Sequence, residues 1–166
     1  MVDFGSDEEI DRWLALLIDT EGAMGIYKVT YGGSTHRSYA PQMNINMGTP
    51  QVLEVAHTLI PKSCFNNWIR KQSKKMVWSL NGGANCLREL IPRIYPHLLI
   101  KKPEAELCMK VLKINYETRT ARVMARYDRG KYDKFIDKQH ARCEEAFQEL
   151  KEIRRTRYPM MYPSVS

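Results

Sequence analysis

The chain has 166 residues, of which 43% are hydrophobic and 27% are charged, and its formal net charge is +7. This size and composition exclude an intrinsically disordered protein and favour one hydrophobic core in a single domain over residues 1–166. No apolar run approaches the roughly 18 residues that a membrane span needs, and the acidic start is unlike a targeting peptide, so we expect an intracellular protein, in the cytoplasm or an organelle, without a membrane partner.

Positive charge is concentrated in the middle of the chain. Residues 28–82 contain seven basic side chains and one acid, Glu54. This excess favours a polyanionic partner such as a nucleic acid, although a solvated, solubilising surface explains the charge equally well. The four cysteines stand about twenty or more residues apart without a Cys-x-x-Cys pair, so we expect reduced, mostly buried packing residues.

The first half of the chain predicts a helix, a hairpin and a second helix. Ser6 and Glu9 form a capping box, which predicts a helix that ends near residues 20–22. A hairpin follows, with strands over residues 23–31 and 39–47, and Pro50 begins a helix that stops before Pro61. In the second strand, apolar side chains alternate with amides, which predicts an exposed polar face carrying Gln42, Asn44 and Asn46.

The second half predicts another hairpin and then helices. Its strands are expected over residues 67–72 and 75–80, with Ser73 and Lys74 as the turn. The third strand is expected to direct Trp68, Arg70 and Gln72 outward and Ile69 inward. The fourth strand is expected to direct Lys75, Val77 and Ser79 outward and Met76, Trp78 and Leu80 inward. Helices are expected over residues 84–94, from Pro103 to about residue 116, and in the tail over 120–158.

The order helix-hairpin-helix-hairpin-helix predicts an α+β domain with a four-stranded antiparallel sheet and helices on one face. The core is expected over about residues 6–116, with a C-terminal helical extension over about 118–158. The other face of the sheet would remain open and polar. A surface of this kind can lie in the major groove of DNA.

One segment carries candidate chemistry. Residues 14–22 read Leu-Ala-Leu-Leu-Ile-Asp-Thr-Glu-Gly, an apolar helical run that ends in a carboxylate and a glycine. Glu21 at this helix end is suited to Mg²⁺, which prefers hard oxygen ligands. One carboxylate holds an ion poorly, so two copies of the helix would have to meet about a twofold axis. From the pattern alone, the alternative is an ordinary amphipathic helix with Asp19 and Glu21 at its solvated end.

The nonapeptide resembles the LAGLIDADG motif of homing endonucleases. Glu21 replaces the final aspartate of the motif, and six other residues match it: Leu14, Ala15, Leu17, Ile18, Asp19 and Gly22. Because the motif occurs once, the resemblance implies a homodimer formed through the helix of residues 14–22, with Glu21 as the catalytic, metal-binding acid and the Thr20 backbone carbonyl as a further ligand. Leu16 and Thr20 stand where the family often has glycine, so some shift in helix packing is expected.

A second match covers residues 91–102, which resemble the segment before the later helix in the single-motif, homodimeric members. It implies that Lys101 is the basic residue near the active site, where it would stabilise charge at phosphorus. Thr49 stands at the position of the family's water-ordering glutamine, Gln51 is its substitute if the loop differs, and Leu53 stands near the family's basic position. The resemblance spans about residues 7–116.

The resemblance therefore implies a sequence-specific, Mg²⁺-dependent double-strand DNA endonuclease of intron-homing type that acts on a long, partly palindromic site. An RNA-binding intron maturase on the same scaffold, with intron RNA as its partner and without nuclease activity, is the alternative, and a DNA-binding regulator that has lost catalysis is a third. The residues expected to contact DNA are polar, basic or aromatic and come from both hairpins: Tyr27, Tyr31, Arg37, Gln42, Asn44, Asn46, Trp68, Arg70, Gln72 and Lys75.

Overall fold

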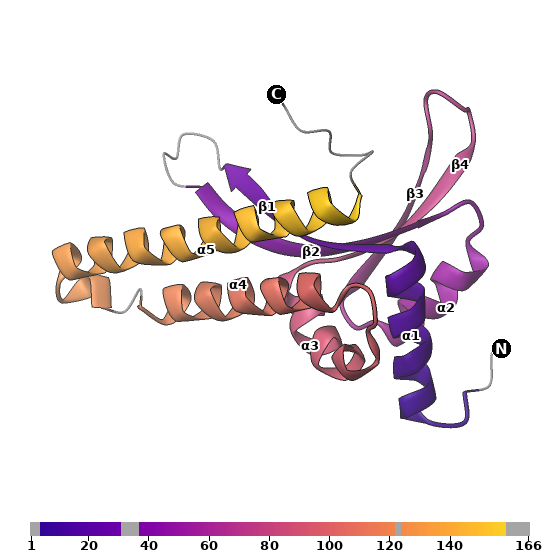
Figure 1. Ribbon diagram of the computed structural model, residues 1–166, viewed down its shortest axis with the longest axis horizontal. Coiled ribbons are helices and arrows are strands. Elements are labelled where there is room, and N and C mark those ends of the chain that lie inside the picture. Colours follow the sequence, from indigo (N-terminus) through magenta and orange to yellow (C-terminus); the bar gives the residue numbers. More distant parts are fainter. Residues whose placement is uncertain (1–3, 31–36, 122–123, 159–166) are drawn as a thin grey trace.

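The computed structural model describes residues 4–30, 37–121 and 124–158. For Thr30, Arg37 and Met124 it describes the backbone only. It has an α+β fold in which two helix-hairpin units are followed by three further α-helices (Figure 1). The elements in chain order are α1 (Asp7–Glu21), β1 (Gly22–Thr30), β2 (Arg37–Met47), α2 (Gln51–Leu59), β3 (Ser63–Ile69), β4 (Met76–Gly82), α3 (Ala84–Ile94), η1 (Tyr95–His97), α4 (Lys102–Ala121), η2 (Met124–Arg126) and α5 (Arg129–Arg157).

The four strands form one antiparallel sheet in the order β1-β2-β4-β3. Strands β2 and β4 pair only between Met43↔Gly82 and Met47↔Trp78, so the two hairpins overlap at their bases and diverge beyond them. We call β1 and β2 the first arm and β3 and β4 the second arm. In Figure 1 the tip of the second arm projects away from the helices.

The core lies between one face of the sheet and the helices. Met24 of β1, Ile45 of β2 and Leu80 of β4 are at most 1% exposed and pack with buried leucines and isoleucines of α1, α3 and α4. The alternation expected for the second strand is confirmed, because Met43 and Ile45 are buried whereas Gln42 and Asn46 are exposed. Removing these side chains from water supplies the main favourable free energy of folding.

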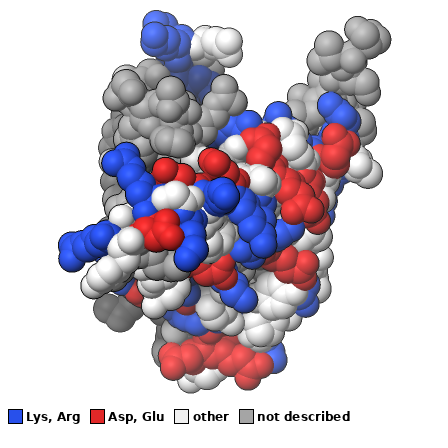
Figure 2. Space-filling view, turned by 90° about the vertical axis from the view of Figure 1, so that its left-hand side faces the viewer, with Lys and Arg blue, Asp and Glu red and all other residues white. Residues whose placement is uncertain are grey.

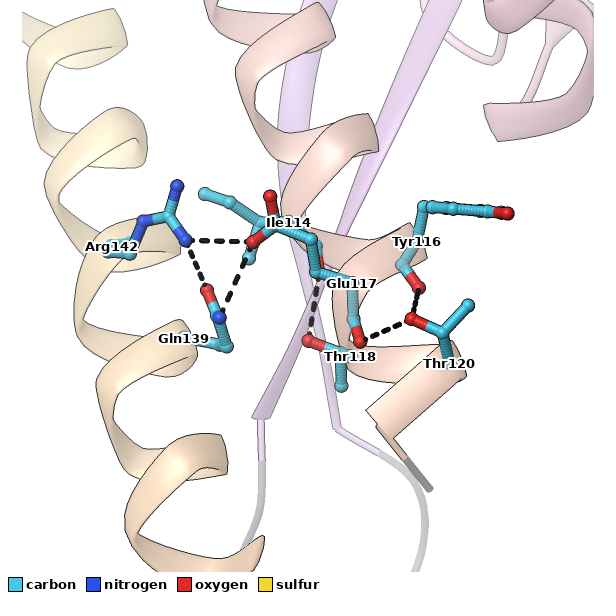
Figure 3. A network of polar contacts seen from close by, with 7 residues as sticks. All are labelled: Ile114, Tyr116, Glu117, Thr118, Thr120, Gln139 and Arg142. Atoms are coloured by element: carbon cyan, nitrogen blue, oxygen red, sulfur yellow. Dashed lines mark hydrogen bonds and ion pairs between the residues drawn. The ribbon is translucent and has the colours of Figure 1, made fainter. Parts of the chain in front are cut away.

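Helices α4 and α5 run side by side and back the first arm (Figure 1). Near the C-terminal end of α4, Arg142 of α5 donates to Glu117 of α4 at 2.9 Å and to the Gln139 side-chain oxygen at 2.6 Å (Figure 3). On α5, Cys143 and Leu150 are buried, and Phe147 and Ile153 are partly buried against the same core. Helix α5 thus contributes side chains to the hydrophobic core formed by the sheet and the other helices.

The cysteines lie mostly in the interior, as expected. Cys86, Cys108 and Cys143 are buried and Cys64 is exposed, all as free thiols. Burial raises the pKa of Cys108 to about 12 and that of Cys86 to about 11, which keeps these thiols protonated at neutral pH. In the described part of the chain, no helix has the length and apolar character needed to cross a bilayer.

The second hairpin differs from the sequence expectation in its bounds. Strand β3 begins at Ser63, four residues earlier than expected, and ends at Ile69. The turn is longer than two residues: the Lys74 N–H donates to the Arg70 carbonyl at 2.8 Å, and Lys74 adopts a left-handed φ of 54°. The polar run over 70–75 offers no apolar side chain to continue the strand pairing, so the chain turns there instead.

Candidate active site and nucleic-acid interface

Helix α1 leads into β1 without a linker. Glu21 is the last helical residue and Gly22 is both the helix C-cap and the first residue of the strand. A Cβ on Gly22 would lie 2.8 Å from the Ile18 carbonyl oxygen and 2.9 Å from the Ile18 Cα. Only glycine lets the strand leave the helix this closely, which explains its place at the end of the motif.

Asp19 is buried and anchors a distant segment to the end of α1. Its carboxylate accepts hydrogen bonds from the backbone N–H groups of Leu99 at 2.7 Å, Ile100 at 3.2 Å and Lys101 at 2.8 Å. These residues precede α4, whose first N–H groups carry partial positive charge and favour a carboxylate. The suggestion that Asp19 lies at a solvated helix end is therefore wrong, because three backbone donors satisfy its charge inside the protein.

Lys101 is brought to the same helix end. Its side chain is 7% exposed, and its ammonium group donates to the Asp19 backbone carbonyl at 3.2 Å. The last carbonyls of a helix have no intrahelical donor and carry partial negative charge, so a cation is stabilised there. The two sequence matches, 80 residues apart, thus meet at the C-terminal end of α1.

Glu21 differs from Asp19 in being exposed to solvent. Since the Asp19 carboxylate is engaged by three N–H groups, Glu21 supplies the free carboxylate of this helix end. Among the residues that the structure describes, no three His, Cys, Asp or Glu side chains are grouped so as to hold a metal ion. One exposed carboxylate with hard oxygen atoms suits Mg²⁺ only when further ligands come from phosphate, water or a second chain.

Thr20, Thr49 and Gln51 lie near this end of the sheet. The Thr20 hydroxyl donates to the Leu16 carbonyl at 2.9 Å, so this side chain is bound within α1. Gly22 pairs with Ile45, and β2 ends two residues later at Met47. Thr49 and Gln51 follow at once and are exposed, so they emerge at the end of the sheet where β1 begins.

The face of the sheet away from the core carries five of the ten expected DNA contacts. Cross-strand pairing puts Tyr27 opposite Ala40, Asn46 opposite Ser79 and Trp68 opposite Val77, all on this open face. Gln42, Asn46 and Trp68 are exposed, whereas Asn44 is half-buried. The Asn44 amide group donates to Ser79 Oγ at 3.1 Å and to the Asn81 side-chain oxygen, so this donor is occupied within the protein.

The other five residues expected to contact DNA lie in the turn of the second hairpin or are not fully described by the structure. Arg70, Gln72 and Lys75 were expected on strands, and this is wrong, because all three lie in the turn between β3 and β4. Tyr31 lies outside the described residues. Arg37 begins β2, but its side chain is not among those described.

The sequence did not point to Asn66 as a residue of the open face, nor to the role of Asp19 as an anchor. Asn66 pairs with Ser79 on the open face and is exposed, next to the amide row of β2 and β4. The Pro61-Lys62 break before Ser63 was the signal for the true start of β3. The role of Asp19 had no local signal, because its three donors come from a segment 80 residues away.

The tip of the second arm is strongly basic. Its turn carries four basic side chains, all exposed, in a run without an acid: Arg70, Lys71, Lys74 and Lys75. By contrast, the face of the molecule shown in Figure 2 has Lys and Arg interspersed with Asp and Glu. A polyanion is therefore attracted to the second arm more than to that mixed face.

Known proteins with this fold were found through structure and not through sequence. No protein-family model matches the chain, and no curated protein sequence matches it significantly. The homing endonuclease I-CvuI, solved in complex with the I-CreI target in the presence of Mg, is 16% identical with a TM-score of 0.58, over 89% of this chain and 96% of that one. The similarity thus spans nearly the whole of both proteins.

Two further structures match over smaller shares. The group I intron-encoded homing endonuclease I-CeuI, complexed with DNA, is 15% identical with a TM-score of 0.57, over 81% of this chain and 69% of that one. The LAGLIDADG homing endonuclease I-LtrWI, bound to target DNA, is 17% identical with a TM-score of 0.56, over 68% of this chain and 39% of that one. The chain therefore has the fold of the LAGLIDADG homing endonucleases.

Proposed function

We propose that the protein is a sequence-specific, divalent-metal-dependent double-strand DNA endonuclease of intron-homing type that acts as a homodimer. The observation that carries this proposal is the convergence of the two sequence matches at one helix end: Asp19 anchors the segment before α4, Lys101 is buried beside it, and Glu21 is left exposed. The fold shared with homing endonucleases solved on DNA supports the same conclusion.

Glu21 is the proposed metal-binding acid, with the Thr20 backbone carbonyl as a second oxygen donor. A Mg²⁺ ion held there would neutralise charge at phosphorus and lower the pKa of a bound water. The negative end of the α1 macrodipole adds to the attraction for a cation. This donor set is incomplete in one chain, which is the chemical reason for proposing that two chains share the site.

The proposed dimer contact is the exposed side of α1. Leu16 is 60% exposed, and Leu99 and Ile100, which the Asp19 carboxylate holds beside the helix end, are 85% and 47% exposed. Large apolar side chains grouped on one surface favour contact with another protein surface. Packing of two α1 helices here would bring both Glu21 side chains toward a common axis and require a partly palindromic target.

The chain's own residues would divide the remaining tasks. The Lys101 ammonium, fixed by the Asp19 carbonyl, supplies positive charge where negative charge develops on the phosphoryl oxygens. Thr49 and Gln51 are exposed at the same end of the sheet and would order water there. Gln42, Asn46, Asn66 and Trp68 on the open face would contact base edges in the major groove, with Arg70, Gln72 and Lys75 of the turn as base or phosphate contacts.

The test begins with selection of cleaved duplexes from a randomised DNA library in the presence of Mg²⁺. With the selected site, we expect Glu21→Gln to lower the cleavage rate at least about a thousandfold, or about 4 kcal/mol of transition-state stabilisation, and to leave DNA affinity within a few-fold. Glu54→Gln, which changes an exposed glutamate on α2, is the matched control and should cleave normally.

Two outcomes contradict the proposal. If the folded wild-type dimer binds DNA but no cleaved site is recovered from the library, the protein is not an endonuclease. If Glu21→Gln cleaves at the wild-type rate, Glu21 is not the metal-binding acid. Sedimentation of Leu16→Glu checks the dimer separately, because a charge on the proposed contact should yield monomers.

A further inference from the structure

The last turn of α5 contacts strand β1 close to Glu21. The Arg154 guanidinium donates to the Met24 backbone carbonyl at 2.7 Å, and Met24 lies three residues beyond Glu21. Strand β1 forms one edge of the sheet, so the backbone groups on its outer side have no strand partner among the described residues. Arg154 supplies this strand with a charged donor from a helix 130 residues later in the chain.

Gly25 provides the space that Arg154 occupies. A Cβ at this position would lie 2.5 Å from Arg154 Nη2 and 3.3 Å from Arg154 Cζ. Any larger residue would therefore displace the guanidinium. The preceding residue, Met24, is 1% exposed. The strand is therefore held by the core on one side and by Arg154 at its edge.

The same turn of α5 contacts the start of α4. Arg157 forms an ion pair with Glu104, whose side chain is 4% exposed. The other carboxylate oxygen of Glu104 is buried and, among the described residues, has no hydrogen-bond partner. A half-buried ion pair of this kind adds little stability compared with apolar packing, but here it joins the last turn of α5 to the first turn of α4.

Glu104 is close in the chain to Lys101. Lys101 immediately precedes α4 and Glu104 lies in the first turn of α4, where the Ala105 N–H donates to the Lys101 carbonyl at 3.0 Å. Lys101 in turn binds the Asp19 carbonyl two residues before Glu21. Arg154 and Arg157, three residues apart, thus hold the two chain segments that flank the end of α1: one follows Glu21 and the other carries Lys101.

We propose that Arg154 and Arg157 form a positioning clamp, through which the C-terminal helix α5 sets the relative placement of Glu21 and Lys101. This inference rests on the proposed nuclease function. The arginines act through the backbone of β1 and through α4 and touch neither DNA nor metal. A displacement of about 1 Å at a reacting group can lower a rate by as much as a hundredfold, so a small loss of order at this joint has a large effect on cleavage.

The first experiment separates cleavage from binding. For Arg154→Ala we expect the single-turnover cleavage rate with Mg²⁺ to fall about tenfold, with DNA affinity measured in Ca²⁺ changed less than about twofold. Arg154→Lys, which keeps one charged donor, should recover part of the rate. Arg155→Ala is the matched control, because Arg155 lies in the same turn but pairs with Glu152 at 2.9 Å on the exposed side of α5.

Gly25→Ala tests the same contact from the opposite side. Its methyl group would displace the guanidinium, so we expect a loss of rate similar to that of Arg154→Ala. If both changes act through one contact, the double variant should be no slower than the slower single variant, whereas independent effects would multiply. Multiplying effects, or an unchanged rate in folded Arg154→Ala, would overturn the clamp.

Hydrogen exchange of the metal-free protein tests the clamp independently of nuclease activity. In Arg157→Ala the amides of Leu99, Ile100 and Lys101, which bind Asp19, should exchange about tenfold faster, whereas amides of β3 and β4 should not change. Unchanged exchange at these three amides refutes the clamp and leaves the nuclease proposal standing. Faster exchange in a protein that cleaves no DNA refutes the nuclease and supports the clamp as a property of the fold.

Discussion

The two arms of the sheet are supported in different ways. In the first arm, the Glu144 carboxylate of α5 accepts hydrogen bonds from Lys28 Nζ at 2.9 Å and from the Tyr39 hydroxyl, and Lys28 Nζ lies 4.7 Å from the centre of the Phe147 ring. In the second arm, three apolar side chains are exposed near the tip: Trp68 at 45%, Ile69 at 57% and Met76 at 43%.

The difference indicates which arm depends on the helices. The first arm is joined to α5 by charge and aromatic contacts, so changes there should be felt in the free energy of unfolding. The second arm extends beyond the helices and exposes apolar and basic side chains around its tip. Its substitutions should change stability little and nucleic-acid affinity more, because exposed side chains contribute mainly when a partner covers them.

The largest expected effect is on the free energy of unfolding when an aromatic side chain is removed from the first arm, compared with the same kind of change in the second arm. Tyr39 is 6% exposed, so Tyr39→Ala should lower the free energy of unfolding by about 3–5 kcal/mol through lost packing. Trp68→Ala should cost about 1 kcal/mol or less, because nearly half of the side chain is already in water. Urea unfolding of the free protein measures both values, and equal losses would contradict the difference between the arms.

The second effect depends on pH and concerns the first arm alone. Hydrogen bonds from Lys28 and then Tyr39 lower the pKa of Glu144 from 4.5 to about 2. Its contribution to stability is therefore fully present above pH 4.5 and is lost as the pH falls toward 2. Compared with Glu144→Gln, the wild type should be more stable by about 1 kcal/mol at neutral pH, since the pair is partly exposed.

Unfolding measured from neutral pH downward checks this prediction. The difference between wild type and Glu144→Gln should shrink below pH 4.5 and approach zero near pH 2. Lys75→Ala in the second arm serves as the control and should follow the wild-type profile. A difference that persists at low pH would mean that packing, and not the charge of Glu144, joins α5 to the arm.

The third prediction concerns the second arm and the dependence of its DNA affinity on salt. It carries the smallest expected change in stability. Arg70→Ala and Lys75→Ala should each lower the slope of log affinity against log salt by about 0.9 if each side chain neutralises one phosphate. The free energy of unfolding should change by less than about 0.5 kcal/mol, because both side chains are exposed turn residues. Lys134→Ala on α5 is the charge-matched control, and an equal loss of slope there would refute a special role for the second arm.

Local patterns predicted much of this fold. The helix start predicted at Ser6 is confirmed, with the Ser6 hydroxyl accepting the Glu9 N–H at 3.3 Å, and the helix over residues 84–94 has the bounds expected. The alternation of β2 also holds, since a strand between core and solvent must alternate. The start of β3 was misplaced because its first residues do not alternate cleanly between polar and apolar.

The candidate site was less accessible to sequence reasoning. The motif identified Glu21 and the second match identified Lys101, but their common environment depends on Asp19 and on backbone donors of a distant segment. Side-chain exposure at the second-arm tip was missed for a related reason. Ile69 was expected to face inward, and it does share its side of the sheet with Met76, yet the helices do not extend far enough to cover it.

The absence of a linker between α1 and β1 has a consequence for any redesign of target preference. Because Glu21 and Gly22 are consecutive, covalent geometry would set the separation along the duplex between the bond cut by the proposed endonuclease and the first base pair under β1. An inserted residue at this junction would shift the two relative to each other. A variant of that kind should keep its affinity for the target while losing the match between recognition and the position of the cut.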